Sequence, residues 1–167
     1  MSTVSEVQAA PSRHILLVDD DRLVLATLQR GLAAAGYAVE VCDNGREALE
    51  RHRQTPADII LLEIRMPAMR GLELARAMLQ AVYRPILMLS AHDDGPIVGE
   101  AIALGVSGYL VKPIEVNQLI PSIEAALARF AEVSALMKDS ASLREGVERN
   151  RVISTAVGIV MERAGLT

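Results

Sequence analysis

The sequence predicts a doubly wound α/β fold, with a five-stranded parallel sheet followed by a long C-terminal helix. Five short apolar segments each precede a segment with apolar residues at helical spacing. The short segments lack the polar and apolar alternation of a half-exposed sheet, so helices are expected on both faces. Of the 167 residues, 51% are hydrophobic and only 2% are aromatic, which predicts a core of aliphatic side chains.

Turn and capping residues indicate where the elements begin and end. Asp21 is expected to open the first helix, where a carboxylate favours the helix dipole. Gly36 follows the first helix, Asn44 can cap the second, and Gly105 ends the fourth. The expected strands are HILLV at 14–18, AVEVC at 38–42, ADIILL at 57–62, RPILMLS at 84–90 and GYLV at 108–111.

Charge and cysteine content exclude several classes of protein. The 17 Lys and Arg against 21 Asp and Glu give a net charge of -4, so any contact with nucleic acid must be local. The single Cys42 excludes an internal disulfide, and the N-terminal residues have no signal-peptide pattern. No apolar run approaches the roughly 18 residues of a membrane span. We therefore expect a cytoplasmic protein without a membrane partner.

Polar residues end four of the five predicted strands. Asp19 and Asp20 follow the first strand, Glu63 the third, Ser90 closes the fourth and Lys112 follows the fifth. The carboxyl ends of parallel strands meet at one edge of a sheet, where functional groups gather in this fold class. Carboxylates about 4 Å apart repel by on the order of 4 kcal/mol each at an effective dielectric near 20. One lysine offsets one charge, so the pattern predicts a bound divalent cation, and oxygen ligands suit Mg²⁺.

Four motifs in this order, HILLVDDD, LLEIRMP, LMLSA and GYLVKP, resemble the receiver domain of bacterial two-component response regulators across residues 13–128. The resemblance implies a flavodoxin-like sheet and a sensor kinase or another regulatory protein as partner. It implies that Ser90 and Lys112 bind a phosphoryl group and that Tyr109 turns inward on activation. The implied Mg²⁺ ligands are the carboxylates of Asp19, Asp20 and Glu63 and the backbone carbonyl of Arg65.

Glu63 stands where the family has its phosphoacceptor aspartate. The extra methylene displaces the carboxylate, and a misplacement of about 1 Å can cost roughly a hundredfold in rate. Three interpretations are open: Glu63 imitates the phosphorylated state, the site is a vestige controlled by a partner, or the residue is an engineered substitution. Because the other site residues are present, we favour an intact pocket that is independent of phosphorylation or fixed in one state.

The helical pattern continues past residue 128. Leu136, Leu143, Asn150 and Val157 are spaced by seven, with apolar and small residues between them, as in a short coiled coil where a polar residue can set the register. We expect 129–150 to be a dimerisation helix and the chain to be a homodimer through 130–163. The alternative is a solvated amphipathic helix that packs back on the sheet.

The last segment, RVISTAVGIVMERAGLT at 151–167, resembles the first helix of the ANTAR domain, the RNA-binding module of AmiR- and NasR-type antitermination regulators. The resemblance implies that the segment is an incomplete domain and that RNA hairpins are partners of a complete one. Four residues of this segment are weak candidates for RNA binding: Arg151, Gly158, Met161 and Arg163. We therefore expect either a truncated chain or a natural variant whose RNA-binding output is impaired.

Other interpretations remain beside a response regulator that controls antitermination. One is an Mg²⁺-dependent phosphohydrolase or phosphotransferase of a related α/β fold, although the chain has no room for the substrate-binding cap of such enzymes, so no enzyme activity is expected. Another is an adaptor whose pseudo-receiver only dimerises.

Residues 1–12 are small and polar and include a proline, so they are expected to form a disordered arm.

Overall fold

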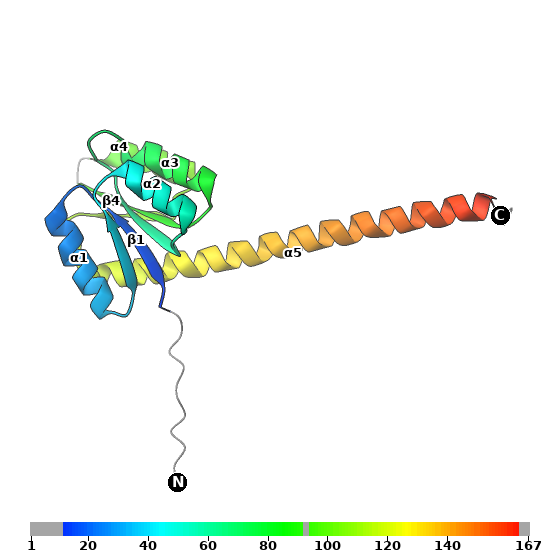
Figure 1. The fold of residues 1–167 in the computed structure, drawn as a ribbon, viewed down its shortest axis with the longest axis horizontal. Helices are drawn as coiled ribbons and strands as arrows, with labels where there is room; N and C mark the ends of the chain where they lie inside the picture. The colour runs from blue at the N-terminus through cyan, green and yellow to red at the C-terminus, as the bar shows by residue number, and fades with distance from the viewer. Residues whose placement is uncertain (1–11, 92–93, 164–167) are drawn as a thin grey trace, which may run out of the picture. The chain divides into compact units, whose positions relative to one another are not determined.

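The fold is an open parallel sheet with helices on both faces, continued by a long helix (Figure 1). The structure is a computed structural model that describes residues 12–91 and 94–163, with side chains as far as Arg149. The chain divides into two compact units, Met1–Ala128 and Arg129–Thr167. The predicted arm at 1–12 lies almost wholly outside the described residues.

Strands and helices alternate from His14 onward in the first unit. The strands are β1 (His14–Val18), β2 (Ala38–Cys42), β3 (Ile59–Glu63), β4 (Ile86–Ser90) and β5 (Gly108–Val111). The helices are α1 (Arg22–Ala34), α2 (Gly45–Gln54), α3 (Gly71–Ala81), α4 (Gly95–Leu104) and α5 (Val116–Arg163), the last of which continues into the second unit.

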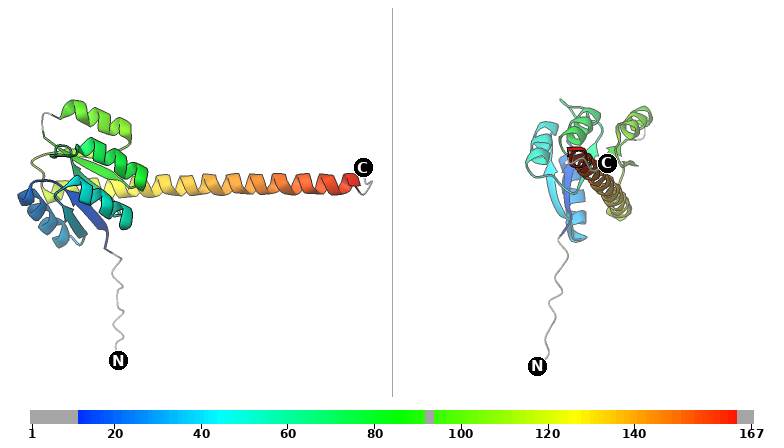
Figure 2. Two further views of the ribbon diagram at one scale, coloured as in Figure 1. Left: turned by 45° about the horizontal axis from the view of Figure 1, so that its top comes forward. Right: turned by 90° about the vertical axis from the view of Figure 1, so that its right-hand side faces the viewer.

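The five strands are all parallel, in the order β2-β1-β3-β4-β5, which confirms the predicted doubly wound fold. Alternate residues of β1, β3 and β4 enter two cores, because side chains along a strand point to opposite faces. One core contains α1 and the first turns of α5, and the other contains α2, α3 and α4 (Figure 2).

Two predicted strands begin two residues too early. β3 starts at Ile59, because the Asp58 side chain before it accepts the His14 backbone N–H at 2.7 Å. β4 starts at Ile86, because Pro85 has no N–H to donate to a neighbouring strand.

The predicted helix caps are confirmed: Asp21 and Asn44 accept first-turn N–H groups of α1 and α2. Gly105 ends α4 with a φ of 106°.

Gly71 allows α3 to begin directly against the end of β3. A Cβ atom at this position would lie 2.2 Å from the Glu63 carbonyl oxygen and 2.7 Å from the Ile64 Cα. Both neighbours are backbone atoms, so they cannot move aside without displacing the strand that carries Glu63. The start of α3 and the candidate site are therefore coupled through one close approach.

We expect Gly71→Ala to lower the free energy of unfolding by about 3 kcal/mol, at the upper end of typical overpacking costs. Chemical denaturation followed by circular dichroism measures this. Gly99→Ala in α4 is the matched control, since nothing lies within 4 Å of its added Cβ. The control is expected to raise stability by about 0.5–1 kcal/mol, the helix propensity difference. Equal stability of the two variants would contradict the close approach.

The second unit continues α5 from Arg129 to Arg163 as one helix. Its side chains from 135 to 149 are exposed, and four large apolar ones are more than 60% exposed: Leu136, Met137, Leu143 and Val147. Leu136 and Leu143 are two of the heptad positions predicted from the sequence. No helix within the described part of the chain combines the length and apolar character that crossing a bilayer requires.

Candidate functional site

The sheet register brings the predicted polar residues to one edge. Val18 is paired with Leu62, so Asp19 and Glu63 lie side by side at the ends of β1 and β3. Ser90 is paired with Val111, and the Lys112 N–H donates to the Ser90 carbonyl at 2.7 Å. Asp19 and Glu63 continue the alternation of the strand residues that face α1 and α5. Their carboxylates therefore emerge on the same side of the sheet.

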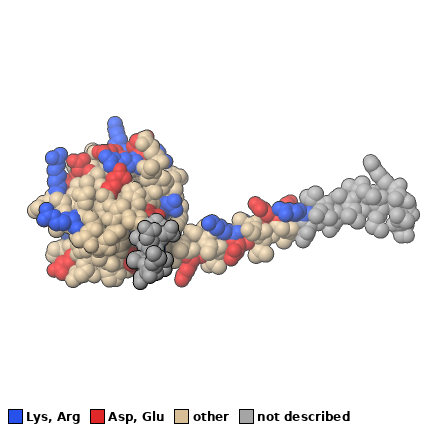
Figure 3. All heavy atoms as spheres, turned by 60° about the horizontal axis from the view of Figure 1, so that its bottom comes forward, with Lys and Arg blue, Asp and Glu red and all other residues tan. Residues whose placement is uncertain are grey.

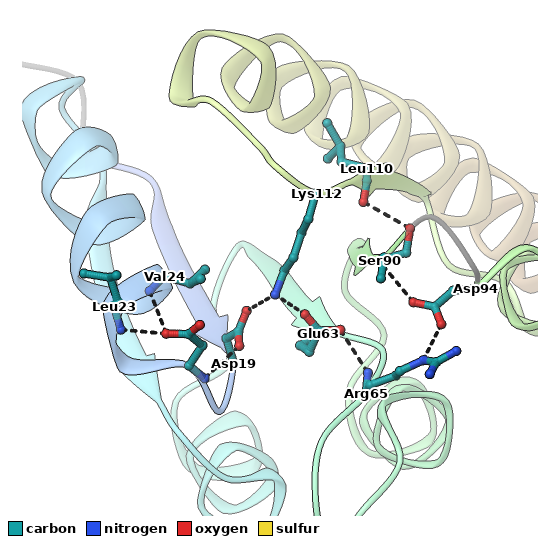
Figure 4. Close-up of polar contacts among 11 residues, drawn as sticks. Asp19, Leu23, Val24, Glu63, Arg65, Ser90, Asp94, Leu110 and Lys112 are labelled. Carbon is teal, nitrogen blue, oxygen red and sulfur yellow. Dashed lines mark hydrogen bonds and ion pairs between the residues drawn. The ribbon is translucent and has the colours of Figure 1, made fainter.

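The Lys112 ammonium joins the two carboxylates (Figure 4). It donates to Asp19 Oδ2 at 2.7 Å and forms an ion pair with Glu63 Oε2. The other oxygens accept backbone N–H groups: Asp19 Oδ1 from Asp21 at 2.9 Å, and Glu63 Oε1 from Arg65 at 3.0 Å. All four carboxylate oxygens thus have a hydrogen-bonding or ion-pairing partner within the protein.

Burial makes this network electrostatically strong. Asp19 is fully buried and Glu63 is 5% exposed. Burial by itself lowers the pKa of Lys112, but hydrogen bonds to Asp19 and Glu63 more than offset it, so the pKa is raised above its ordinary value of 10.5. The lysine is therefore a permanent cation between two carboxylates at neutral pH.

Neither Ser90 nor Tyr109 is directed toward Glu63. The Ser90 hydroxyl donates to the Leu110 carbonyl at 3.3 Å (Figure 4). Tyr109 is 48% exposed. Ser90 thus lies at the predicted edge, but neither the Ser90 nor the Tyr109 side chain is bonded to the network of Asp19, Glu63 and Lys112.

A second ion pair at this edge was not predicted. The Arg65 guanidinium contacts Oδ1 of Asp94, and Oδ2 of the same carboxylate accepts the Ala91 N–H at 2.8 Å. Asp94 is 1% exposed and directly precedes α4. The sequence signal was weak: Asp94 stands before Gly and Pro at a helix start, a position where Asp usually only caps. Arg65 thereby links the loop after β3 to the start of α4.

The predicted Mg²⁺ ligands are only partly assembled. Asp19, Asp20, Glu63 and the Arg65 backbone all lie at or just after the ends of β1 and β3, and Asp20 is exposed. Within residues 12–91 and 94–163, no three His, Cys, Asp or Glu side chains are arranged to hold a metal ion. The donor set is all oxygen and so fits Mg²⁺ chemically, but the cation would compete with Lys112 for both buried carboxylates.

The weak RNA-binding candidates lie in the second unit. The backbone of 151–163 is helical, and the side chains of Arg151, Met161 and Arg163 are outside the described residues, as are residues 164–167. On the face shown in Figure 3, acidic and basic side chains are interspersed in each unit, and no continuous basic stripe is visible among the described residues. The structure leaves these candidates as predictions.

Comparisons with known proteins find regulatory proteins that are similar to this chain. The chain is 31% identical over 164 residues to the transcriptional regulatory protein PdtaR of Mycobacterium tuberculosis, covering 98% of this chain and 80% of that protein. It is 40% identical over 120 residues to the response regulator MprA of Mycobacterium leprae, covering 70% of this chain and 51% of MprA. The chain therefore spans about half the length of that second relative.

A solved structure and a family profile agree with these relatives. The chemotaxis protein CheY4 of Vibrio cholerae superposes with a TM-score of 0.64 at 33% identity, covering 69% of this chain and 98% of that one. The family described as the response regulator receiver domain matches residues 15–124, which include every residue of the network at the sheet edge. The chain belongs to the response regulator receiver family of two-component signalling.

Proposed function

We propose that this receiver works without stable phosphorylation of Glu63 and that its output regulates transcription. The observation that carries the first part is the Lys112 ammonium held between the buried carboxylates of Asp19 and Glu63. The Lys112 ammonium already neutralises part of the carboxylate charge that a bound metal ion would neutralise. The site is thereby biased toward the unphosphorylated state without a metal ion.

The geometry of Glu63 opposes phosphoryl transfer. To form an acyl phosphate, a carboxylate oxygen must attack phosphorus in line with the leaving group. Both Glu63 oxygens are instead held, one by Lys112 and one by the Arg65 N–H. Mg²⁺, when bound, would neutralise charge on the incoming phosphoryl group, and Asp19, Asp20, Glu63 and the Arg65 carbonyl are the groups that would hold it. Lys112 weakens that binding by occupying the same oxygens.

The orientation of Ser90 and Tyr109 supports a resting state over imitation of the phosphorylated one. The hydroxyl hydrogen-bonds to Leu110 and not to Glu63, and the aromatic ring is half exposed. In the receiver family the matching aromatic turns inward on activation. A glutamate that imitated phosphate would draw Ser90 toward its carboxylate. We therefore infer that the glutamate keeps the receiver in its resting state.

Incubation with acetyl phosphate and Mg²⁺, followed by intact-protein mass spectrometry, tests this function. We expect no phosphorylated species, and NMR spectra that change little on addition of beryllofluoride. Stable phosphorylation of Glu63 would overturn the proposal. Turnover of a phosphate ester would instead favour the Mg²⁺-dependent phosphohydrolase or phosphotransferase, the alternative enzyme class for this fold.

For the output we propose transcription antitermination through RNA hairpins in a protein whose ANTAR domain is complete. The support is the resemblance of 151–167 to the first helix of that domain and the similarity to a relative named as a transcriptional regulatory protein. After residue 128 the sequence has six Lys and Arg against five Asp and Glu. We therefore expect weak binding of hairpin RNA by the 167-residue chain in a gel-shift experiment. Tight, specific binding would contradict the interpretation that its RNA-binding output is impaired.

A dimerising adaptor is the second candidate, and the exposed stripe of Leu136, Leu143 and Val147 favours it. We expect the chain to dimerise through 130–163, because burying a leucine stabilises by about 1.5–3 kcal/mol. Leu136→Asp combined with Leu143→Asp is expected to raise the dimer dissociation constant by about 100-fold or more. Analytical ultracentrifugation over a concentration series measures it.

The matched control for dimerisation places the same two charges off the stripe. Ala141→Asp combined with Ser142→Asp changes exposed positions of the same helix, and the dimer is expected to persist. A monomeric parent protein, or equal loss of dimer in both variants, would show that the stripe is a solvated helix face.

A further inference from the structure

A groove runs between α3 and α4, and its walls do not include Asp19, Glu63 or Lys112. It consists of two hollows of about 440 and 420 Å³ that share Leu72 and Glu100 in their walls. We call it the α3–α4 groove. Its walls include Arg70, Leu72, Arg76, Ile97, Glu100 and Leu104.

The floor of the groove is apolar. Met66, Leu72, Ile97 and Leu104 are half-buried and pack against the core beneath α3 and α4. Their outer surfaces remain uncovered by the described residues of the chain. A strip of apolar surface between two helices can accept the apolar face of a third helix. The α3 helix has 11 residues, so the strip accommodates about three helical turns.

The rim of the groove is basic, although the chain as a whole is acidic. Arg70 and Arg76 are exposed, and neither has an ion pair within the part of the chain that the structure describes. Glu73 lies between them on α3 but is not part of the walls, which leaves Glu100 as the one acid among the wall residues that the structure describes. A chain of net charge -4 therefore presents a local positive rim around an apolar floor.

We propose that the α3–α4 groove binds an acidic amphipathic helix of a partner protein. The apolar face of that helix covers Leu72 and Ile97, and its carboxylates pair with Arg70 and Arg76. Such charge complementarity contributes to association rate and specificity. RNA fits less well, because the described residues of the walls include no aromatic side chain on which a base could stack. The site is independent of whether Glu63 accepts phosphate.

Selection from a phage-displayed library tests the proposal. The library consists of helical peptides of about 16 residues, with leucines at helical spacing and all other positions randomised. With the full chain as target, we expect selected peptides to be enriched in Asp and Glu. In fluorescence anisotropy they should bind at least about tenfold more tightly than the same peptides with Lys in place of the acids.

A matched pair of variants locates the binding. Arg70→Gln with Arg76→Gln is expected to weaken the selected peptides by about tenfold or more, and added salt should weaken binding to the parent protein. Arg30→Gln with Arg53→Gln removes the same charge from exposed positions on α1 and α2 and should change affinity less than about twofold. No enrichment, enrichment of basic peptides, equal loss in both variants, or hairpin RNA that displaces the peptides would overturn the proposal.

Discussion

Glu63→Asp is expected to restore phosphorylation by acetyl phosphate in the presence of Mg²⁺. The substitution removes one methylene and withdraws the carboxylate from the Lys112 ammonium that now holds it. The shorter carboxylate can attack phosphorus, releasing acetate and forming the acyl phosphate. Correcting a misplacement of about 1 Å is worth roughly a hundredfold in rate, so labelling should rise at least that much. Intact-protein mass spectrometry over a time course measures it.

Two controls separate this effect from a general change in acidity. Glu63→Gln removes the nucleophile and should give no labelling, and Glu100→Asp shortens an exposed acid away from the sheet edge and should match the parent protein. Absence of label on Glu63→Asp, with the fold intact, would show that the rest of the pocket is not competent. Phosphorylation in the parent protein at the same rate would remove the role given to the extra methylene.

Lys112→Ala is expected to lower the free energy of unfolding by about 3–5 kcal/mol, because removing one partner of a buried ion pair leaves uncompensated charge. Here two carboxylates, Asp19 at 0% and Glu63 at 5% exposure, lose the cation that joins them. Lys138→Ala is the matched control, since Lys138 is exposed on the helix of the second unit. Urea denaturation at pH 7 measures both, and similar stabilities would contradict the bridging role.

Neutralising one carboxylate should rescue the lysine variant. Glu63→Gln added to Lys112→Ala removes one of the two unpaired charges, so it is expected to recover a large part of the loss. A rescue of this kind is not expected if Lys112 acts only by packing its alkyl chain. The double-mutant cycle therefore assigns the coupling free energy to the charges themselves.

The pH dependence of the same bridge has a defined sign. The pKa of Lys112 in the folded protein is raised above its ordinary value of 10.5, so the folded protein retains the proton more strongly than the unfolded chain. The contribution is fully present below that ordinary value and is lost as pH rises through the raised one. We expect the stability difference between the parent protein and Lys112→Ala to be constant from pH 7 to about 9 and to shrink only in stronger alkali.

Local sequence determined most of the fold and the composition of the candidate site. Strands buried on both faces have to be covered by helices, so the five apolar segments and the helical segments between them specified a doubly wound sheet. Asp21, Asn44 and Gly105 act through short-range backbone geometry and could be placed without tertiary information. The parallel topology then brought Asp19, Glu63 and Lys112 to one edge, because Glu63 ends β3 and the other two directly follow β1 and β5.

Only the tertiary structure decided how these side chains are paired. Lys112 and Glu63 have long side chains with several rotatable bonds, and their contact depends on residues 49 positions apart in the sequence being packed at one sheet edge. The same reason explains why the Arg65 and Asp94 pair, the orientation of Ser90 and the basic rim of the α3–α4 groove were not predicted. Periodicity assigns a residue to a face of an element. The choice of partner on that face depends on burial and on the competing charges nearby, which arise only when the elements pack.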